Sequence, residues 1–162
     1  MLDYLGIFKE FNAKKIKYLV VGGLAVNFYG IPRMTYDIDI LLSLDDENVH
    51  AFLGLMKKWD FKPKAPVNMT DFADQVKRKD WIANKNMKAF NFVNPQWGVS
   101  EIDIILDSPI SYEKAITNVK DVDLKGVLVP TISIKDLIKM KQISNRQQDI
   151  SDISHLTRIK NG

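Results

Sequence analysis

Apolar residues recur at helical spacing in several segments of the chain. Near the start, apolar residues recur every three positions, which predicts an amphipathic helix; they are Leu2, Leu5, Phe8 and Phe11. The last segment carries Ile150, Ile153 and Leu156 at the same spacing, on one face of a final helix over residues 146–160. Further helices are expected over residues 22–29, 45–59, 112–117 and 133–144, with residues 71–79 as a candidate inside the polar segment 60–86.

Shorter apolar runs, some of them alternating with polar residues, predict β-strands. These runs cover residues 18–21, 36–42, 87–93, 99–106 and 127–129. The segment Asn94-Pro95-Gln96-Trp97-Gly98 predicts a hairpin between the third and fourth of them. Because strands and helices are interspersed, we expect an α/β (α+β) fold with a small mixed β-sheet flanked by helices. The length fits one domain over 1–162, with a core at 15–130 and a C-terminal helical part at 131–162.

Two of the predicted strands carry acidic residues at alternate positions. Asp37 and Asp39 share one face of their strand, about 7 Å apart at Cα, because successive side chains point to opposite faces. Glu101 and Asp103 repeat the pattern. If the two strands are neighbours, the carboxylates converge and raise one another's pKa unless a cation neutralises them. All-oxygen ligands favour Mg²⁺ or Mn²⁺. The alternative is that the acids lie on the solvated face of an edge strand.

A pair of glycines separates the first predicted strand from the helix that follows it. Gly22 and Gly23 have no side chains, so a phosphate could approach the backbone N–H groups at the helix start. The alternative is a tight strand-to-helix turn that binds no ligand.

Composition excludes some classes of site. The chain has no cysteine, so disulfides and thiolate metal sites are absent, in agreement with a cytoplasmic location. The N-terminus has no signal-peptide pattern, and no apolar run is long enough to span a membrane. The net charge of +3 permits a polyanionic partner without requiring one.

Together the glycines and acids resemble a known signature. Gly22-Gly23, a spacer of thirteen residues and Asp37-Ile38-Asp39 are similar to the first motif of the polymerase-β-like nucleotidyltransferase superfamily. Asp103, between two isoleucines, resembles the third carboxylate of that superfamily.

Other residues resemble one branch, the small proteins grouped with AbiEii-type toxin nucleotidyltransferases. Arg33 and Thr35 precede the acids as they do in that branch, and the tail is similar to its C-terminal motif. The residues of the tail that carry this resemblance are Lys141, Arg146, Asp149 and Asp152.

The resemblance implies transfer of a nucleoside monophosphate from an NTP to an acceptor hydroxyl, with release of pyrophosphate. It implies that two metal ions are held by Asp37 and Asp39, and one of them also by Asp103. Asp103 is then also placed to take the proton of the acceptor hydroxyl.

The resemblance also implies a nucleotide-binding set, namely Gly22, Gly23, Arg33, Thr35 and Lys141. For Arg33 the alternative is a loop arginine that caps a helix, and for Lys141 an exposed helical lysine. We expect the hydroxyl of Thr35 to fix the turn before the strand. Helical ion pairing explains Arg146 with Asp149 or Asp152 as well as catalysis does, and we interpret that group as mainly structural.

The acceptor is left open between RNA, a protein and a small molecule. Lys77-Arg78-Lys79 with Trp81 could contact RNA, but we expect a solvated charge run beside a core aromatic residue. The alternatives to an enzyme are a catalytically silent nucleotide-binding protein and a toxin–antitoxin partner protein on the same fold.

Overall fold

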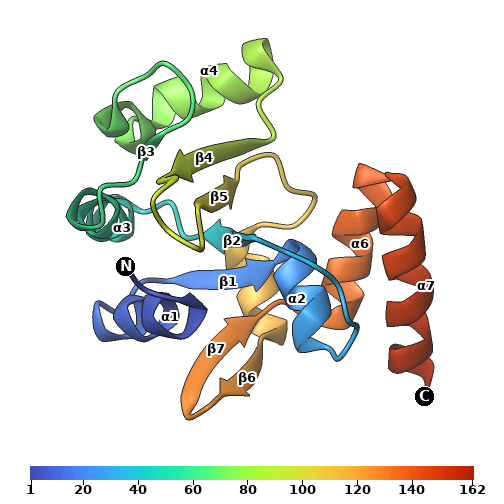
Figure 1. Cartoon of the computed structure of the whole chain (residues 1–162). Coiled ribbons are helices and arrows are strands. Elements are labelled where there is room, and N and C mark those ends of the chain that lie inside the picture. The colour runs from blue at the N-terminus through green and yellow to red at the C-terminus, as the bar shows by residue number, and fades with distance from the viewer.

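The computed structural model describes residues 1–162 and contains one mixed β-sheet (Figure 1). The order of its strands is β3-β4-β5-β2-β1-β7-β6. Its strands are β1 (Tyr18–Val21), β2 (Asp37–Leu42), β3 (Lys62–Pro63), β4 (Ala89–Val93), β5 (Glu101–Ile105), β6 (Lys120–Leu124) and β7 (Val127–Thr131). The β2–β5 and β1–β7 pairs are parallel and the other pairs are antiparallel, so the expected mixed sheet is confirmed.

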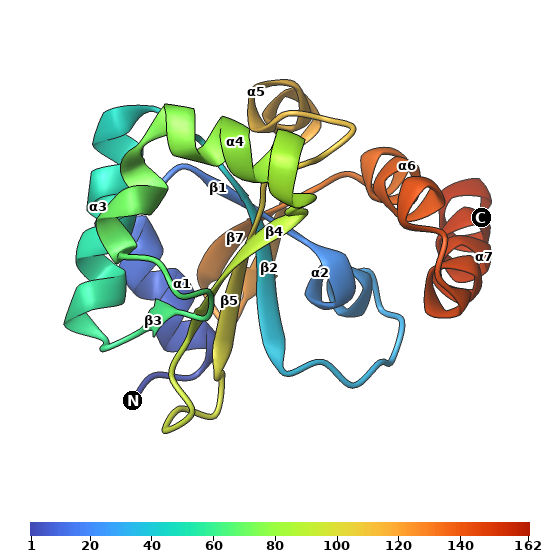
Figure 2. The ribbon, with the colours of Figure 1, turned by 90° about the horizontal axis from the view of Figure 1, so that it is seen from above.

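Helices flank this sheet on both faces. They are α1 (Tyr4–Ala13), α2 (Gly22–Phe28), α3 (Asp46–Lys58), α4 (Gln75–Lys85), α5 (Tyr112–Ala115), α6 (Ile134–Ser144) and α7 (Gln147–Asn161), with 3₁₀ turns η1 (Met69–Ala73) and η2 (Ile116–Asn118). Figure 2 shows α1, α3 and α4 on one side of the sheet and α2, α6 and α7 on the other. None of these helices combines the length and apolar character needed to cross a membrane.

The face toward α1 and α3 is the apolar side of the sheet. Even-numbered positions of β2, β4 and β5 point to this side and are fully or almost fully buried; they are Ile38, Ile40, Phe90, Phe92, Ile102 and Ile104. Aromatic rings pack there edge to face, as Phe52 of α3 does against Phe92 at 5.5 Å. This packing fixes which face of each strand is left for the odd-numbered residues.

The helix starts follow ordinary capping chemistry. Asp45 accepts a hydrogen bond from the Asn48 backbone N–H at 2.8 Å, and Ser133 accepts one from Asp136 N at 3.2 Å. These caps explain why α3 and α6 begin where the sequence predicts.

Three elements differ from the prediction. β6 was not expected, because two acids and a lysine lower the strand propensity of Lys120–Leu124. It forms as an edge strand because Lys125 and Gly126 both have positive φ and make a tight hairpin to β7. β3, with only two residues, is recognisable only from its pairing with β4. In the polar segment, the helix covers 75–85 in place of 71–79.

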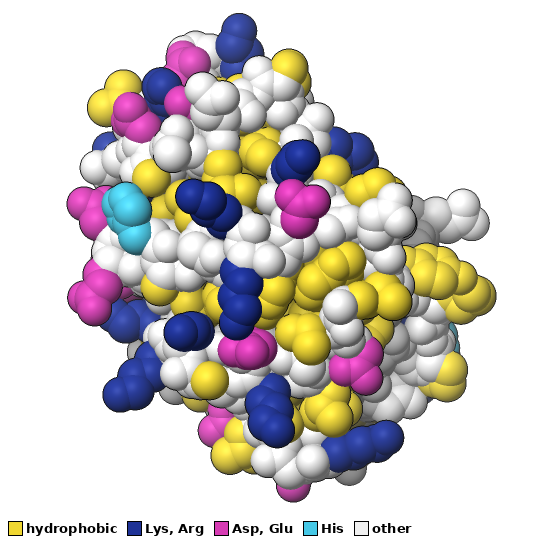
Figure 3. Space-filling view, turned by 60° about the vertical axis from the view of Figure 1, so that its left-hand side comes forward, with side chains coloured by type: hydrophobic (Ala, Val, Ile, Leu, Met, Phe, Trp, Pro, Cys, Tyr) yellow, Lys and Arg dark blue, Asp and Glu magenta, His cyan; other side chains and the backbone are white.

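Charge is mixed over the surface drawn in Figure 3. On that face Lys and Arg side chains are scattered among Asp and Glu side chains and hydrophobic areas. The small positive excess of the chain therefore forms no uniform basic region on this face, as binding a nucleic acid by charge alone would require.

Candidate active site

The parallel pairing of β2 with β5 brings the acidic residues of both strands together. Asp37 lies opposite Glu101, and Asp39 lies opposite Asp103. The predicted convergence is therefore confirmed. The alternative of an edge strand is wrong, because β2 lies between β5 and β1 inside the sheet.

Three of the four carboxylates form a compact cluster. Asp37, Glu101 and Asp103 each offer an oxygen, and these oxygens lie within 4.8 Å of one another. The cluster includes Glu101, which the sequence places on the correct face but which the predicted set of ligands leaves out. The remaining carboxylate, Asp39, lies two residues along β2 from Asp37, opposite Asp103 and next to Gly22.

The close approach of the Asp39 carboxylate requires a glycine at position 22. Its φ is +64°, and a Cβ atom added to it would lie 2.2 Å from Oδ2 of Asp39. Any side chain at this position would push the carboxylate away. A Cβ on Gly23 would lie 3.2 Å from Nε of Arg33 and 3.4 Å from Oγ1 of Thr35. The glycine pair thus lets Asp39, Arg33 and Thr35 pack directly against the backbone at the start of α2.

We predict that Gly22→Ala destabilises the protein and displaces Asp39. A left-handed conformation costs an alanine about 1–2 kcal/mol, and the clash adds to that cost. The melting temperature should fall by several degrees, measured by circular dichroism. Gly54→Ala is the matched control, since Gly54 lies in α3 with open space around it and alanine is the better helix former. Equal melting temperatures for both variants would contradict the prediction.

Burial makes the acidic cluster electrostatically unfavourable. It raises the pKa of Asp103 to about 8; a hydrogen bond from Asn91 opposes the shift, and the nearby charges of Glu101 and Asp39 add to it. Burial also raises the pKa of Asp37, which the charge of Glu101 raises further, and that of Asp39. The site therefore stabilises a bound proton or a cation.

Two residues that the sequence analysis missed contact the cluster. Asn91 Nδ2 donates to Asp103 Oδ1 at 2.6 Å and lies 3.4 Å from Glu101 Oε2. Lys64 Nζ donates to Glu101 Oε1 at 3.3 Å. Asn91 could have been found, since it alternates with Phe90 and Phe92 and pairs with Asp103 in the predicted hairpin. Lys64 is brought there by the unexpected strand β3.

A network of buried charges joins α6 and α7 to the rest of the site. Lys141 Nζ lies 2.9 Å from Asp152 and 3.4 Å from Asp149. Arg33, from the loop before β2, pairs with Asp152 as well. The interpretation of Lys141 as an exposed helical lysine is wrong: it is 4% exposed, because both of its acidic partners lie on the next helix. The interpretation of Arg33 as a helix cap is replaced by this ion pair.

The predicted pairing of Arg146 with Asp149 is confirmed. Arg146 Nε lies 3.0 Å from Asp149 Oδ2, and the backbone N–H of Arg146 donates to the same oxygen. Burial acts to raise the pKa of Asp149, but these hydrogen bonds outweigh it and hold the pKa well below its usual range. The charges of Lys141 and Arg146 also act on Asp39, where both favour the ionised carboxylate. The C-terminal helices therefore place two cations near Asp39.

A cavity of about 540 Å³ is lined both by residues of the sheet, such as Asp39, and by residues of the C-terminal helices. We call it the Gly22 cavity. Gly22, Asp39, Lys141 and Arg146 line one part of it, and Leu137 and Met140 of α6 contribute apolar surface. Its volume is in the range of small-molecule sites.

Thr35 has the local role that its position predicts. Its Oγ1 lies 3.4 Å from the carbonyl oxygen of Asp37, across the turn that leads into β2.

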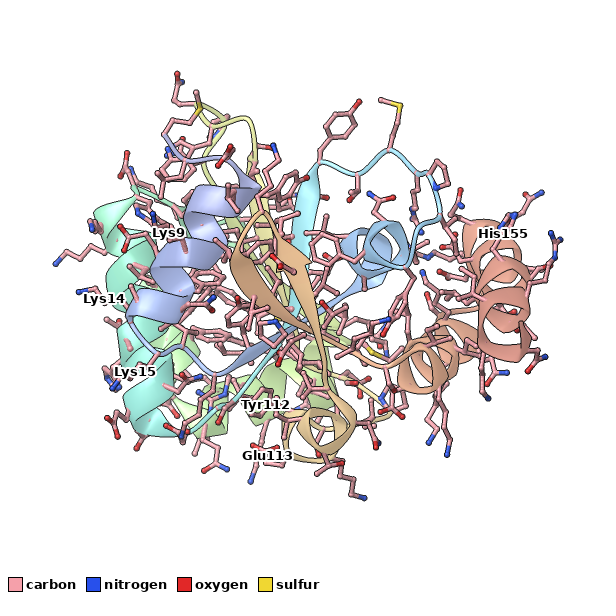
Figure 4. The ribbon with its side chains drawn as sticks, turned by 90° about the horizontal axis from the view of Figure 1, so that it is seen from below. Lys9, Lys14, Lys15, Tyr112, Glu113 and His155 are labelled. Carbon is pink, nitrogen blue, oxygen red and sulfur yellow. The ribbon has the colours of Figure 1, made fainter.

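The remaining candidates lie outside the acidic cluster. Arg78 corrects the expectation of a solvated charge run: it is buried and donates to the carbonyl of Phe72 at 2.6 Å. Trp81 is buried, as expected for a core aromatic. Residues that were not candidates also lie at the periphery: Figure 4 shows His155 on α7, and Lys9, Lys14 and Lys15 at the α1 side of the molecule.

The family of the chain is shown by its sequence. The family described as nucleotidyltransferase of unknown function (DUF6036) matches residues 5–161, so the chain belongs to this family of nucleotidyltransferases. No curated protein matches the chain. The assignment to the AbiEii-type branch stays a prediction.

Solved structures share the fold at low sequence identity. The chain is similar to the lincosamide antibiotic adenylyltransferase LnuA, with a TM-score of 0.63 and 17% identity over 94% of this chain and 93% of that one. It is similar to an antigenic nucleotidyltransferase-like protein from Paracoccidioides brasiliensis, with a TM-score of 0.57 and 18% identity over 93% and 71%. The antibiotic-resistance factor ANT(2'')-Ia gives a TM-score of 0.55 and 10% identity over 96% and 80%. These likenesses confirm the predicted polymerase-β-like nucleotidyltransferase fold.

Proposed function

We propose that the protein transfers a nucleoside monophosphate from an NTP to an acceptor hydroxyl in a metal-dependent reaction. The observation that carries the proposal is the register of β2 and β5, which aligns Asp37 with Glu101 and Asp39 with Asp103. We further propose that the core 15–130 and the C-terminal part 131–162 act as one unit. The core supplies the carboxylates, and the C-terminal part supplies Lys141 and Arg146.

The carboxylates fit a hard divalent cation. The donor set consists of oxygens only, and the raised pKa values of these acids mark an excess of negative charge. We assign Asp37, Asp39 and Asp103 as ligands of Mg²⁺ or Mn²⁺, with Glu101 beside them. When bound there, such ions neutralise the charge that develops on the transferring phosphoryl group and on the leaving oxygen.

Positive charge around the glycine pair suits the triphosphate. Arg33 packs against Gly23, and Lys141 lines the same cavity as Gly22 and Asp39. We assign Gly22, Gly23, Arg33, Thr35 and Lys141 to nucleotide binding. In the reaction the acceptor oxygen forms a bond to the α-phosphorus, and the bond to the bridging oxygen breaks. Pyrophosphate leaves with the bonding electron pair, and Asp103 accepts the hydroxyl proton.

Label transfer tests the proposal. The purified protein is incubated with each α-labelled NTP, Mg²⁺ or Mn²⁺, and a cell extract, with the Asp37→Ala/Asp39→Ala variant as control. Label on RNA, protein or a small molecule only with the intact acids is the expected result. Metal-dependent NTP binding without any labelled product would favour a catalytically silent nucleotide-binding protein or a toxin–antitoxin partner.

The pKa of Asp103 predicts how metal affinity depends on pH. Below pH 8 the metal-free folded protein holds a proton on Asp103, because its pKa is raised to about 8, and a metal ion must displace that proton. Mg²⁺ affinity should therefore increase from pH 6 to pH 8, by up to about tenfold per pH unit for one displaced proton.

The stability of the metal-free protein should change in the opposite direction. Between about pH 4 and pH 8 the folded state binds more protons at Asp103 than the unfolded state, so stability decreases as pH rises. Titration calorimetry at three pH values measures the affinity, and thermal unfolding in EDTA measures the stability. Asp103→Asn should reduce both slopes, and equal Mg²⁺ affinity at pH 6 and pH 8 would contradict the prediction.

A further inference from the structure

A second cavity lies at the other end of the acidic strands. Its volume is about 620 Å³, and we call it the Tyr36 cavity. Thr35 and Tyr36, which line it, directly precede Asp37, and Val99 precedes Glu101 by two residues. The cavity therefore borders the starts of the parallel strands β2 and β5, where the carboxylate cluster begins. It shares no lining residue with the Gly22 cavity.

Tyr4 connects this cavity to the carboxylates. Its hydroxyl donates to the carbonyl oxygen of Thr35 at 3.0 Å, which holds the phenol at the strand start. Burial raises the pKa of Tyr4, and the charges of Asp37 and Asp39 raise it further. The phenol is thus within electrostatic reach of both acids. The carboxylates themselves do not line the cavity, but Tyr36 leads directly into Asp37, at the end of the strands away from Lys141 and Arg146.

The linings of the two cavities differ in their cations. Lys88, Lys141 and Arg146 line the Gly22 cavity, where Asp39, Asp107 and Asp149 balance their charge, whereas neither Lys nor Arg lines the Tyr36 cavity. Asp3 is the charged residue in the lining of the Tyr36 cavity. This lining therefore offers no cation to a polyanion, accommodates a neutral molecule without a charge penalty, and attracts a positively charged one.

The lining also presents apolar surface to solvent. Five of the eight lining residues are hydrophobic. Tyr36 is 62% exposed, so most of its ring is available to a ligand. An exposed aromatic ring beside acidic groups is suited to stack on an apolar or cationic group.

We propose that the Tyr36 cavity binds the acceptor, and that this acceptor is a neutral or positively charged small molecule with an apolar face and a free hydroxyl group. The inference rests on the proposed transferase function and narrows it, because it places RNA and other polyanions outside the set of acceptors. The nucleotide then occupies the Gly22 cavity, and the carboxylate cluster lies between the two substrates.

Fractionation of the acceptor tests the chemical class. A cell extract is separated into RNA, protein, and anionic, neutral and cationic small molecules, and each fraction is incubated with the protein, α-labelled NTP and Mg²⁺. Label in the neutral or cationic small-molecule fraction is expected. Label in RNA, protein or the anionic fraction would overturn the inference and leave the transferase proposal standing. Absence of label in every fraction would overturn both.

Introducing a positive charge at Tyr36 tests whether the acceptor binds in the Tyr36 cavity. With the labelled fraction as acceptor, Tyr36→Lys should raise the acceptor KM by about tenfold or more, through lost stacking and added positive charge. The KM for NTP should stay within twofold. Met34→Lys is the matched control, because Met34 is 78% exposed in the same loop and does not line the cavity. Equal effects of the two variants, or a changed KM for NTP alone, would show that the acceptor binds elsewhere.

Discussion

Asp39→Asn is expected to reduce nucleotidyl transfer by about 10³-fold, because a bound metal ion contributes several kcal/mol to transition-state stabilisation. Asparagine keeps the size of the side chain and its place beside Gly22, so the fold should be retained. What is lost is the negative charge at the position between the cluster and the Gly22 cavity. The initial rate of label transfer measures the loss, and calorimetry measures the parallel loss of Mg²⁺ affinity.

The control for this substitution is Asp121→Asn. Asp121 is an exposed acid on β6 of the same sheet, remote in strand order from β2 and β5. Its replacement should change the transfer rate by less than twofold. If Asp39→Asn kept transfer and Mg²⁺ affinity close to those of the unmodified protein, the assignment of Asp39 as a metal ligand would be wrong.

Lys141→Met should lower the free energy of unfolding by about 3 kcal/mol, toward the lower end of the range for breaking a buried ion pair. Asp149 and Asp152 are buried, and the substitution removes their shared cation. The lower end applies because Asp149 keeps Arg146 as a partner, and Asp152 keeps Arg33. Urea unfolding measures the change.

Lys139→Met separates this effect from the loss of any helical lysine. Lys139 is exposed on α6, so its replacement should change stability by less than about 0.5 kcal/mol. The double variant Lys141→Met/Asp152→Asn should be more stable than the sum of the single effects predicts, because it removes charges of both signs. Similar unfolding curves for Lys139→Met and Lys141→Met would contradict the buried network.

Local sequence patterns were enough to predict the acidic residues Asp37, Asp39 and Asp103. The other residues of the site depend on contacts between segments that are distant in the sequence. The alternation of acids and isoleucines fixes the face of each side chain, whatever its neighbours are, so Asp37, Asp39 and Asp103 could be assigned from the sequence. Which of the four carboxylates cluster depends on strand register, and for that reason Glu101 was left out. Lys64 depends on the two-residue strand β3, which has no signal of its own.

The C-terminal helix shows why the spacing of apolar residues alone did not predict which face of the helix is buried. Ile150 was placed on one face with Ile153 and Leu156, yet it is 57% exposed. The buried positions of α7 are Asp149, Asp152 and Leu156, because the facing surface presents the cation of Lys141. A buried polar face of this kind cannot be recognised until the partner helix is known.

One face of the sheet forms the hydrophobic core, and the other face carries the residues of the candidate active site. Along β4 and β5, even-numbered residues belong to the hydrophobic core, and the odd-numbered Asn91, Glu101 and Asp103 belong to the cluster. Adjacent residues of a strand thus have different roles, and a substitution on the cluster face leaves the packing of the core face largely undisturbed. The carboxylate cluster of such a protein can therefore change at alternate positions while its core stays unchanged, and a library that varies the cluster needs to include only those positions.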